Sequence, residues 1–170
     1  PILAAHFGSQ PAFDADNLYR LLTRVQPGRI RVQADEVTYP AHVILRFEIE
    51  RALIEGQIEA KDIPSLWDEK MQSLLGVDTR GNYTDGCMQD VHWSMGAFGY
   101  FPTYTLGNLY AAQFFEKASA DLPGLTEAFA AGDFSGLKRW LNRNIHEHGN
   151  RYRPADLCER VTGKPLSHGP

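Results

Sequence analysis

Cysteine, basic charge and long apolar runs are all scarce in this sequence, and each shortage excludes a class of protein. The 2 cysteines, Cys87 and Cys158, are too few for a disulfide framework and lack metal-site spacing, so a reducing cytoplasm fits best. A formal net charge of −4 argues against nucleic acid as a partner, because phosphate binding needs clustered Lys and Arg. No apolar run approaches the length of a membrane span, so we expect no membrane partner.

The sequence also lacks the HExxH arrangement of zinc hydrolases, in which two histidines one helical turn apart flank a carboxylate base. His146 and His148 come nearest, with Glu147 between them. Residues two apart on a helix point to different faces, so we expect a solvated helix end there and no metal ligands.

Apolar residues recur at helical spacing over most of the chain, separated by Pro, Gly and Asp. Thr38 is a plausible cap for the helix that has Pro40 in its first turn and Gly56 as its stop. The pattern predicts helices at residues 14–27, 40–55, 62–76, 105–120, 123–131, 134–146 and 154–162.

One short stretch alternates as a strand does, because Ile30 and Val32 take turns with Arg31 and Gln33. We therefore predict an all-α fold, mainly helical, with at most one short β ribbon formed by residues 29–33 and 58–60. No shift in composition marks a boundary, so we expect residues 1–170 to form a single helical unit.

The helix expected at residues 40–55 has two neighbouring apolar rows. They are Val43, Phe47 and Ile54 in one row, and Leu45, Ile49 and Leu53 in the other. Glu50 interrupts the first row. A carboxylate on a mostly apolar face is more often paired or at the edge of the stripe than functional, and we favour that interpretation of Glu50.

The composition of residues 86–107 is not explained by the needs of the fold alone. They combine an amide, a carboxylate, an imidazole, an indole and phenols, while Gly96, Gly99 and Pro102 prevent one continuous helix. A pocket wall is favoured by this composition, and an aromatic-rich buried loop is the alternative.

Two side chains each have two interpretations. Arg31 could present its guanidinium to a carboxylate in a cleft, or form a structural ion pair with Asp35 or Glu36. His92 could donate to a developing oxyanion, or be a core histidine bonded to Asp90 or a carbonyl. Most of the tyrosines must serve packing.

Two sequence motifs resemble those of a known protein family. Residues 30–35 resemble the IRxxAD motif, and residues 86–93 resemble the GxxQDxHW motif, of the M32 metallocarboxypeptidases, the thermostable carboxypeptidase Taq family. The flanking segments 35–40, 98–104 and 106–113 are similar to that family in the same order. The resemblance covers nearly the whole chain.

This resemblance implies a groove-bearing, mostly helical peptidase, usually a homodimer, that removes single residues from peptide C-termini with zinc or cobalt. The family's HExxH and following glutamate motif lie upstream of the region matching Pro1, and its final helical segment should follow Ser167. We therefore expect the C-terminal part of a larger enzyme, which alone holds no metal and is inactive. The competing hypothesis is a non-catalytic helical binding or assembly module that retains the pocket wall.

The resemblance also implies roles for individual residues. Arg31 is the position expected to bind the free carboxylate of the substrate, and Tyr100 is also expected to bind the substrate. His92 and Tyr104 match positions expected to donate to the tetrahedral intermediate, although Tyr100 and Tyr104 lie in the same matching stretch. The residues expected to orient these groups are Gln89, Asp90 and Asp35.

Overall fold

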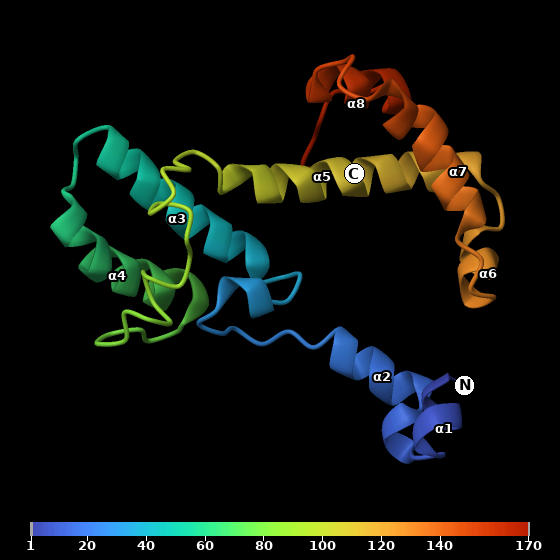
Figure 1. Ribbon diagram of the computed structural model, residues 1–170, viewed down its shortest axis with the longest axis horizontal. Helices are drawn as coiled ribbons and strands as arrows, with labels where there is room; N and C mark the ends of the chain where they lie inside the picture. The colour runs from blue at the N-terminus through green and yellow to red at the C-terminus, as the bar shows by residue number, and fades with distance from the viewer. Residues whose placement is uncertain (1, 170) are drawn as a thin grey trace. The chain divides into compact units, whose positions relative to one another are not determined.

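The computed structural model describes residues 2–169, which form two compact units, residues 2–102 and residues 103–169. All regular elements within 2–169 are helical, as predicted, and no strand occurs there (Figure 1). The first unit contains α1 (Ile2–Phe7), η1 (Pro11–Phe13), α2 (Ala15–Leu22), η2 (Arg31–Gln33), α3 (Tyr39–Ile54), η3 (Ala60–Asp62) and α4 (Ile63–Leu75). That the whole chain forms a single unit stays a prediction.

The β ribbon allowed by the sequence pattern does not form. Residues 31–33 make the 3-10 turn η2, closed by hydrogen bonds from Gln33 N–H to Ile30 O and from Ala34 N–H to Arg31 O. Residues 58 and 59 lie in the connection before η3. Four alternating residues are too short a signal to specify a strand when no neighbouring strand pairs with them.

The core of the first unit lies between α3 and α4. Leu45 and Ile49 of α3 pack against Trp67, Met71 and Leu75 of α4. The two helices are joined by a short connection, and the capping box of Glu59 and Asp62 precedes α4. Gly76 ends α4 in the left-handed conformation, with φ of 67°, which glycine adopts without strain.

After α4 the first unit has no further helix. Residues 76–101 form consecutive turns, and we call residues 86–101 of this stretch the site loop. Glycines recur through this stretch and disfavour a helix there, and Pro102 begins the next helix directly after it. Phe101, at the end of the site loop, is 1% exposed.

The second unit is built on a long helix, α5 (Pro102–Asp121), that begins at the last residue of the first unit. Its other elements are α6 (Leu125–Ala130), α7 (Ser135–Asn144), η4 (His146–His148) and α8 (Pro154–Thr162). Trp140 of α7 donates to Asp121 at 3.0 Å. Gln113 of α5 donates to Thr162, the last residue of α8, and to the carbonyl of Pro165 after it. None of the helices within 2–169 is long and apolar enough to cross a membrane.

Candidate active site

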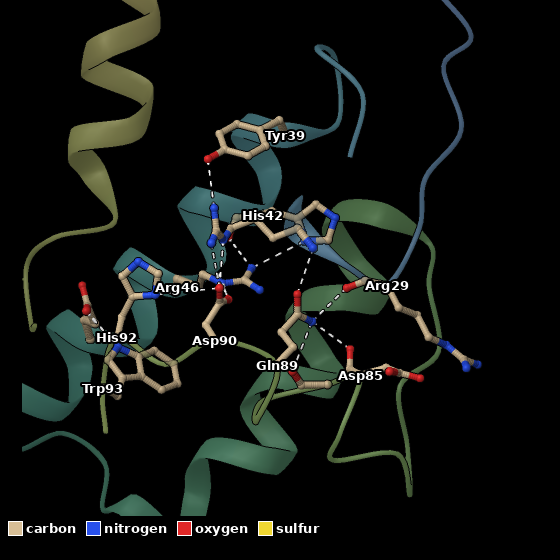
Figure 2. Close-up of polar contacts among 12 residues, drawn as sticks. Arg29, Tyr39, His42, Arg46, Asp85, Gln89, Asp90, His92 and Trp93 are labelled. Carbon is tan, nitrogen blue, oxygen red and sulfur yellow. Dashed lines mark hydrogen bonds and ion pairs between the residues drawn. The ribbon is translucent and has the colours of Figure 1, made fainter. Parts of the chain in front are cut away.

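The amide of Gln89 ties the site loop to the backbone around η2. Its Nε2 donates to the carbonyls of Arg29 at 2.9 Å, Asp85 at 2.7 Å and Gly86 at 3.2 Å. Its Oε1 accepts a hydrogen bond from the backbone N–H of Arg31 at 2.9 Å. In Figure 2 the amide of Gln89 faces both Arg29 and Asp85, and dashed lines mark its hydrogen bonds to them. One amide thus holds both sequence motifs together, using its donors and its acceptor.

Asp90 lies between two arginines. Its Oδ1 accepts from Arg31 Nε at 3.1 Å and Nη2 at 2.7 Å, and its Oδ2 accepts from Arg46 Nε at 2.6 Å. Burial alone raises the pKa of Asp90, but the hydrogen bonds and charges of Arg31 and Arg46 outweigh it and lower this pKa. The carboxylate is therefore ionised, and two guanidiniums with one carboxylate leave an excess of positive charge.

Arg31 is 6% exposed and is held on several sides. Its Nη1 donates to the hydroxyl of Tyr39 at 3.0 Å, and its guanidinium carbon lies 5.6 Å from the centre of the Phe101 ring. Burial lowers the pKa of Arg31, but the interactions with Asp90 more than offset this and raise it. The ion-pair partner of Arg31 is Asp90, and not Asp35 or Glu36 as the alternative interpretation expected.

Asp35 closes the turn that leads into α3. Its Oδ1 accepts from the backbone N–H groups of Val37 and Thr38, both at 2.9 Å, and its Oδ2 accepts from Gln26 N–H at 2.8 Å. These bonds, the one from Gln26 most of all, lower the pKa of Asp35 to about 2. Thr38 precedes α3 as expected, but its side chain makes no capping hydrogen bond.

Sequence reasoning missed Arg46, which is 0% exposed on α3. Its Nη1 donates to the carbonyl of His42 at 2.7 Å, and its guanidinium carbon lies 4.4 Å from the centre of the Trp67 ring. Burial lowers the pKa of Arg46 to about 10, although the charge of Asp90 acts to raise it. The side chain is therefore still charged at neutral pH. Burial and the charge of Arg46 lower the pKa of His42 to about 4.

Glu50 anchors the other end of the site loop. It is 3% exposed, and its Oε1 accepts from Trp93 Nε1 at 2.8 Å while its Oε2 accepts from Gly99 N–H at 3.2 Å. Glu50 is thus hydrogen-bonded inside the structure and does not lie at an edge of the apolar stripe. The spacing of four between His42, Arg46 and Glu50 was the available signal, because it aligns three polar side chains on one helix face.

The aromatic part of the site loop surrounds His92. The centre of its ring lies 4.3 Å from that of Phe101 and 5.7 Å from that of Tyr100. Its Nδ1 lies 3.8 Å from Asp90 Oδ1. The structure therefore brings together Arg31, Gln89, Asp90, His92 and Tyr100 in the first unit. Tyr104 lies in the first turn of α5, in the second unit.

No three His, Cys, Asp or Glu side chains within 2–169 form a group that could hold a metal ion. Asp90 and His92 are near neighbours, but both oxygens of Asp90 already accept hydrogen bonds from arginines. The donor set of the described residues does not fit a catalytic metal.

These features define a helical protein whose irregular loop, rich in aromatic and polar side chains, is fixed to one helix by a buried charge cluster. The family model of the carboxypeptidase Taq (M32) metallopeptidases matches residues 1–170, so the chain belongs to this family. The family predicted from the two motifs is thereby confirmed.

Similar proteins support the same assignment. The chain is 49% identical over 164 residues to thermostable carboxypeptidase 1 of Thermus thermophilus, covering 96% of this chain and 32% of that protein. It is 43% identical over 152 residues to carboxypeptidase 1 of Bacillus subtilis, covering 89% of this chain and 30% of that protein. The structure of Trypanosoma cruzi metallocarboxypeptidase 1 superposes with a TM-score of 0.93 at 46% identity, over 98% of this chain and 35% of that one. The chain thus spans about a third of the length of these relatives.

Proposed function

We propose that this chain is the C-terminal part of a metal-dependent carboxypeptidase that removes single residues from peptide C-termini. Its task is to bind the terminal carboxylate of the substrate and to stabilise the transition state. The observation that carries the proposal is the buried guanidinium of Arg31, held by Asp90 and Tyr39 in a chain of this family. A fixed guanidinium loses little freedom when it binds a carboxylate, which favours tight recognition.

Each side chain then has a defined task. Asp90 occupies the Nε and Nη2 edge of Arg31, so the substrate carboxylate approaches this guanidinium from another side. Tyr100 contacts the substrate, and His92 donates a hydrogen bond to the oxyanion that develops at the scissile carbonyl. For Tyr104, in the second unit, the same donor role rests on the family resemblance alone. The residues that orient these groups are Gln89, Asp90 and Asp35.

Zinc or cobalt, bound by upstream residues of the full-length enzyme, would polarise the carbonyl and activate water. We further propose a homodimer in a reducing cytoplasm, in keeping with the free thiols of Cys87 and Cys158. A non-catalytic helical binding or assembly module is the competing function. Metal analysis and peptide hydrolysis separate the two: we expect neither metal nor activity in the 170-residue chain, and both in a chain extended to the relatives' length.

Replacing Arg31 by Ala in the extended chain tests the carboxylate-binding role. Charge-assisted hydrogen bonds contribute about 1.5–3 kcal/mol each, so kcat/KM on free-carboxylate peptides should fall roughly 100- to 1000-fold. Peptides with an amidated C-terminus should be poor substrates already and lose little more.

Arg31→Lys retains the charge without the planar guanidinium and guards against misfolding of the alanine variant, since removing Arg31 leaves Asp90 without one of its partners. Arg29→Ala is the matched control, because the side chain of Arg29 bonds only to the carbonyl of Asp78 among the contacts described. Equal losses on free and amidated peptides would refute carboxylate recognition by Arg31.

A further inference from the structure

The polar face of α3 holds the site loop at two points. His42, Arg46 and Glu50 follow one another at intervals of four residues, and all are at most 3% exposed. Arg46 binds Asp90 and Glu50 binds Trp93 and Gly99, so the start and the end of the site loop meet the same helix. A buried charge on a helix is costly unless it is paired, and Arg46 has its partner 44 residues away in sequence.

From this geometry we infer that Arg46 is a positioning residue for Arg31, acting through Asp90. Arg46 fixes Oδ2 of Asp90 at 2.6 Å, and Oδ1 of the same carboxylate fixes Nε and Nη2 of Arg31. The two hydrogen bonds to Oδ1 set the plane of the Arg31 guanidinium, so a rotation of the carboxylate would rotate that plane too. The inference rests on the proposed carboxylate-binding function of Arg31.

Arg46 also has an electrostatic consequence. If Asp90 faced Arg31 alone, the carboxylate would cancel the charge of the guanidinium. With Arg46 on its other oxygen, Asp90 is shared by two cations, so Arg31, Arg46 and Asp90 together carry one positive charge. His42, four residues before Arg46, is neutral at pH 7 because its pKa is about 4, so it adds no charge.

The surroundings of Arg46 favour a fixed position over a mobile one. Its guanidinium lies over Trp67 at 4.4 Å and near Phe101 at 5.5 Å, measured from the guanidinium carbon to the ring centres. Its Nη2 has no hydrogen-bond partner within residues 2–169, so the aromatic faces and the Asp90 ion pair balance its burial. Lysine keeps the charge here but cannot make the directed Nε bond.

A double-mutant cycle in the extended, active chain measures whether Arg46 acts through Arg31. Arg46→Lys should raise KM on free-carboxylate peptides about tenfold, or about 1.4 kcal/mol, with kcat nearly unchanged. In an Arg31→Ala background the same substitution should cost nothing further, because the residue through which it acts is gone. Equal losses in both backgrounds would overturn the inference.

Two controls on α3 separate positioning from general damage. Glu50→Gln disturbs the same buried face without touching Asp90, so it should lower kcat/KM by the same factor with and without Arg31. Arg51→Lys, at a side chain that is 61% exposed, makes the same chemical change outside the cluster and should leave KM unchanged.

A readout independent of activity is the Nε–H signal of Arg31 in a ¹⁵N NMR spectrum of the 170-residue chain. We expect its hydrogen exchange to quicken at least tenfold in Arg46→Lys. Arg46→Met should do the same without leaving an unpaired charge in the interior, because Asp90 keeps Arg31 as its partner, and it covers the case that Arg46→Lys fails to fold. Unchanged exchange in the folded variants would refute positioning. Faster exchange together with full activity of Arg31→Ala would refute the proposed function of Arg31 and leave the Arg46–Asp90–Arg31 linkage intact.

Discussion

At the scale of single residues, Gly86 has a physical reason to be glycine. A Cβ built on it would lie 2.5 Å from the carbonyl oxygen of Asn82, which is closer than real Cβ contacts come. The clashing atom belongs to the backbone and cannot rotate away. The first residue of the GxxQDxHW motif is thus required by the turn that delivers Gln89 to the backbone around η2.

Gly86→Ala should therefore lower the free energy of unfolding by about 1–3 kcal/mol, the usual cost of forcing atoms into filled space. Gly107→Ala is the matched control, because a Cβ at Gly107 in α5 meets no atom within 4 Å. Gly107→Ala should raise the free energy of unfolding by about 0.5–1 kcal/mol, because alanine lowers the conformational entropy of the unfolded chain. Urea unfolding followed by circular dichroism measures both. Equal effects of the two substitutions would contradict the steric account of Gly86.

At the scale of elements, α3 differs from an ordinary amphipathic helix. Its inner side combines apolar residues with the buried polar face of His42, Arg46 and Glu50, while Phe47 and Ile54 are 40% and 70% exposed. The apolar row that contains Phe47 and Ile54 is thus not a buried stripe. Polar side chains on the inner side of a helix need hydrogen-bond partners from another segment. For α3 this segment is the site loop.

The burial of His42 on α3 predicts how stability depends on pH. The pKa of His42 is about 4 in the folded chain and about 6.5 when unfolded, so the unfolded chain binds the proton more readily between these values. The stability due to neutral His42 is fully present above about pH 6.5 and is lost as the pH falls towards 4. Asp35, with a pKa of about 2, loses its contribution only below about pH 4.

Urea unfolding at pH 7, 5.5 and 4.5 measures this slope. His42→Gln cannot take up the proton, so the free energy of unfolding of this variant should fall less between pH 7 and 4.5 than that of the unmodified chain. Parallel pH profiles of the two proteins would show that His42 does not cause the loss.

At the scale of the whole molecule, much apolar surface is exposed. In α2 no residue is buried, and Tyr19, Leu21 and Leu22 are 68%, 65% and 83% exposed. Several large, exposed apolar side chains on one helix favour association. We expect the 170-residue chain to self-associate at high concentration.

Sedimentation equilibrium tests this expectation. Leu22→Glu should shift the 170-residue chain towards the monomer, because it places a charge in the apolar face of α2. Arg20→Gln lowers the net charge by the same amount on the same helix and should leave the association unchanged. A chain that is monomeric before any substitution, at all concentrations, would contradict the prediction.

The sequence by itself determined most of the helices and the family. Helix bounds depend on local signals, so Pro40, Gly76 and Pro154 begin or end their helices close to where they were expected. α1 was not predicted, and α2 ends at Leu22, before the expected stop at Pro27. The two motifs also directed attention to Arg31, Gln89 and Asp90, which lie in one hydrogen-bonded network.

Only the tertiary structure decided which charges meet. Arg31 and Asp90 are 59 residues apart, and Arg46 and Asp90 are 44 apart, so no local pattern pairs them. The sequence suggested Asp35 and Glu36 as partners of Arg31 because they are near it in the chain. The prediction for α3 rested on its apolar rows and therefore missed the buried polar face. A folded core brings distant side chains together, and a buried charge then takes the partner that the fold places beside it.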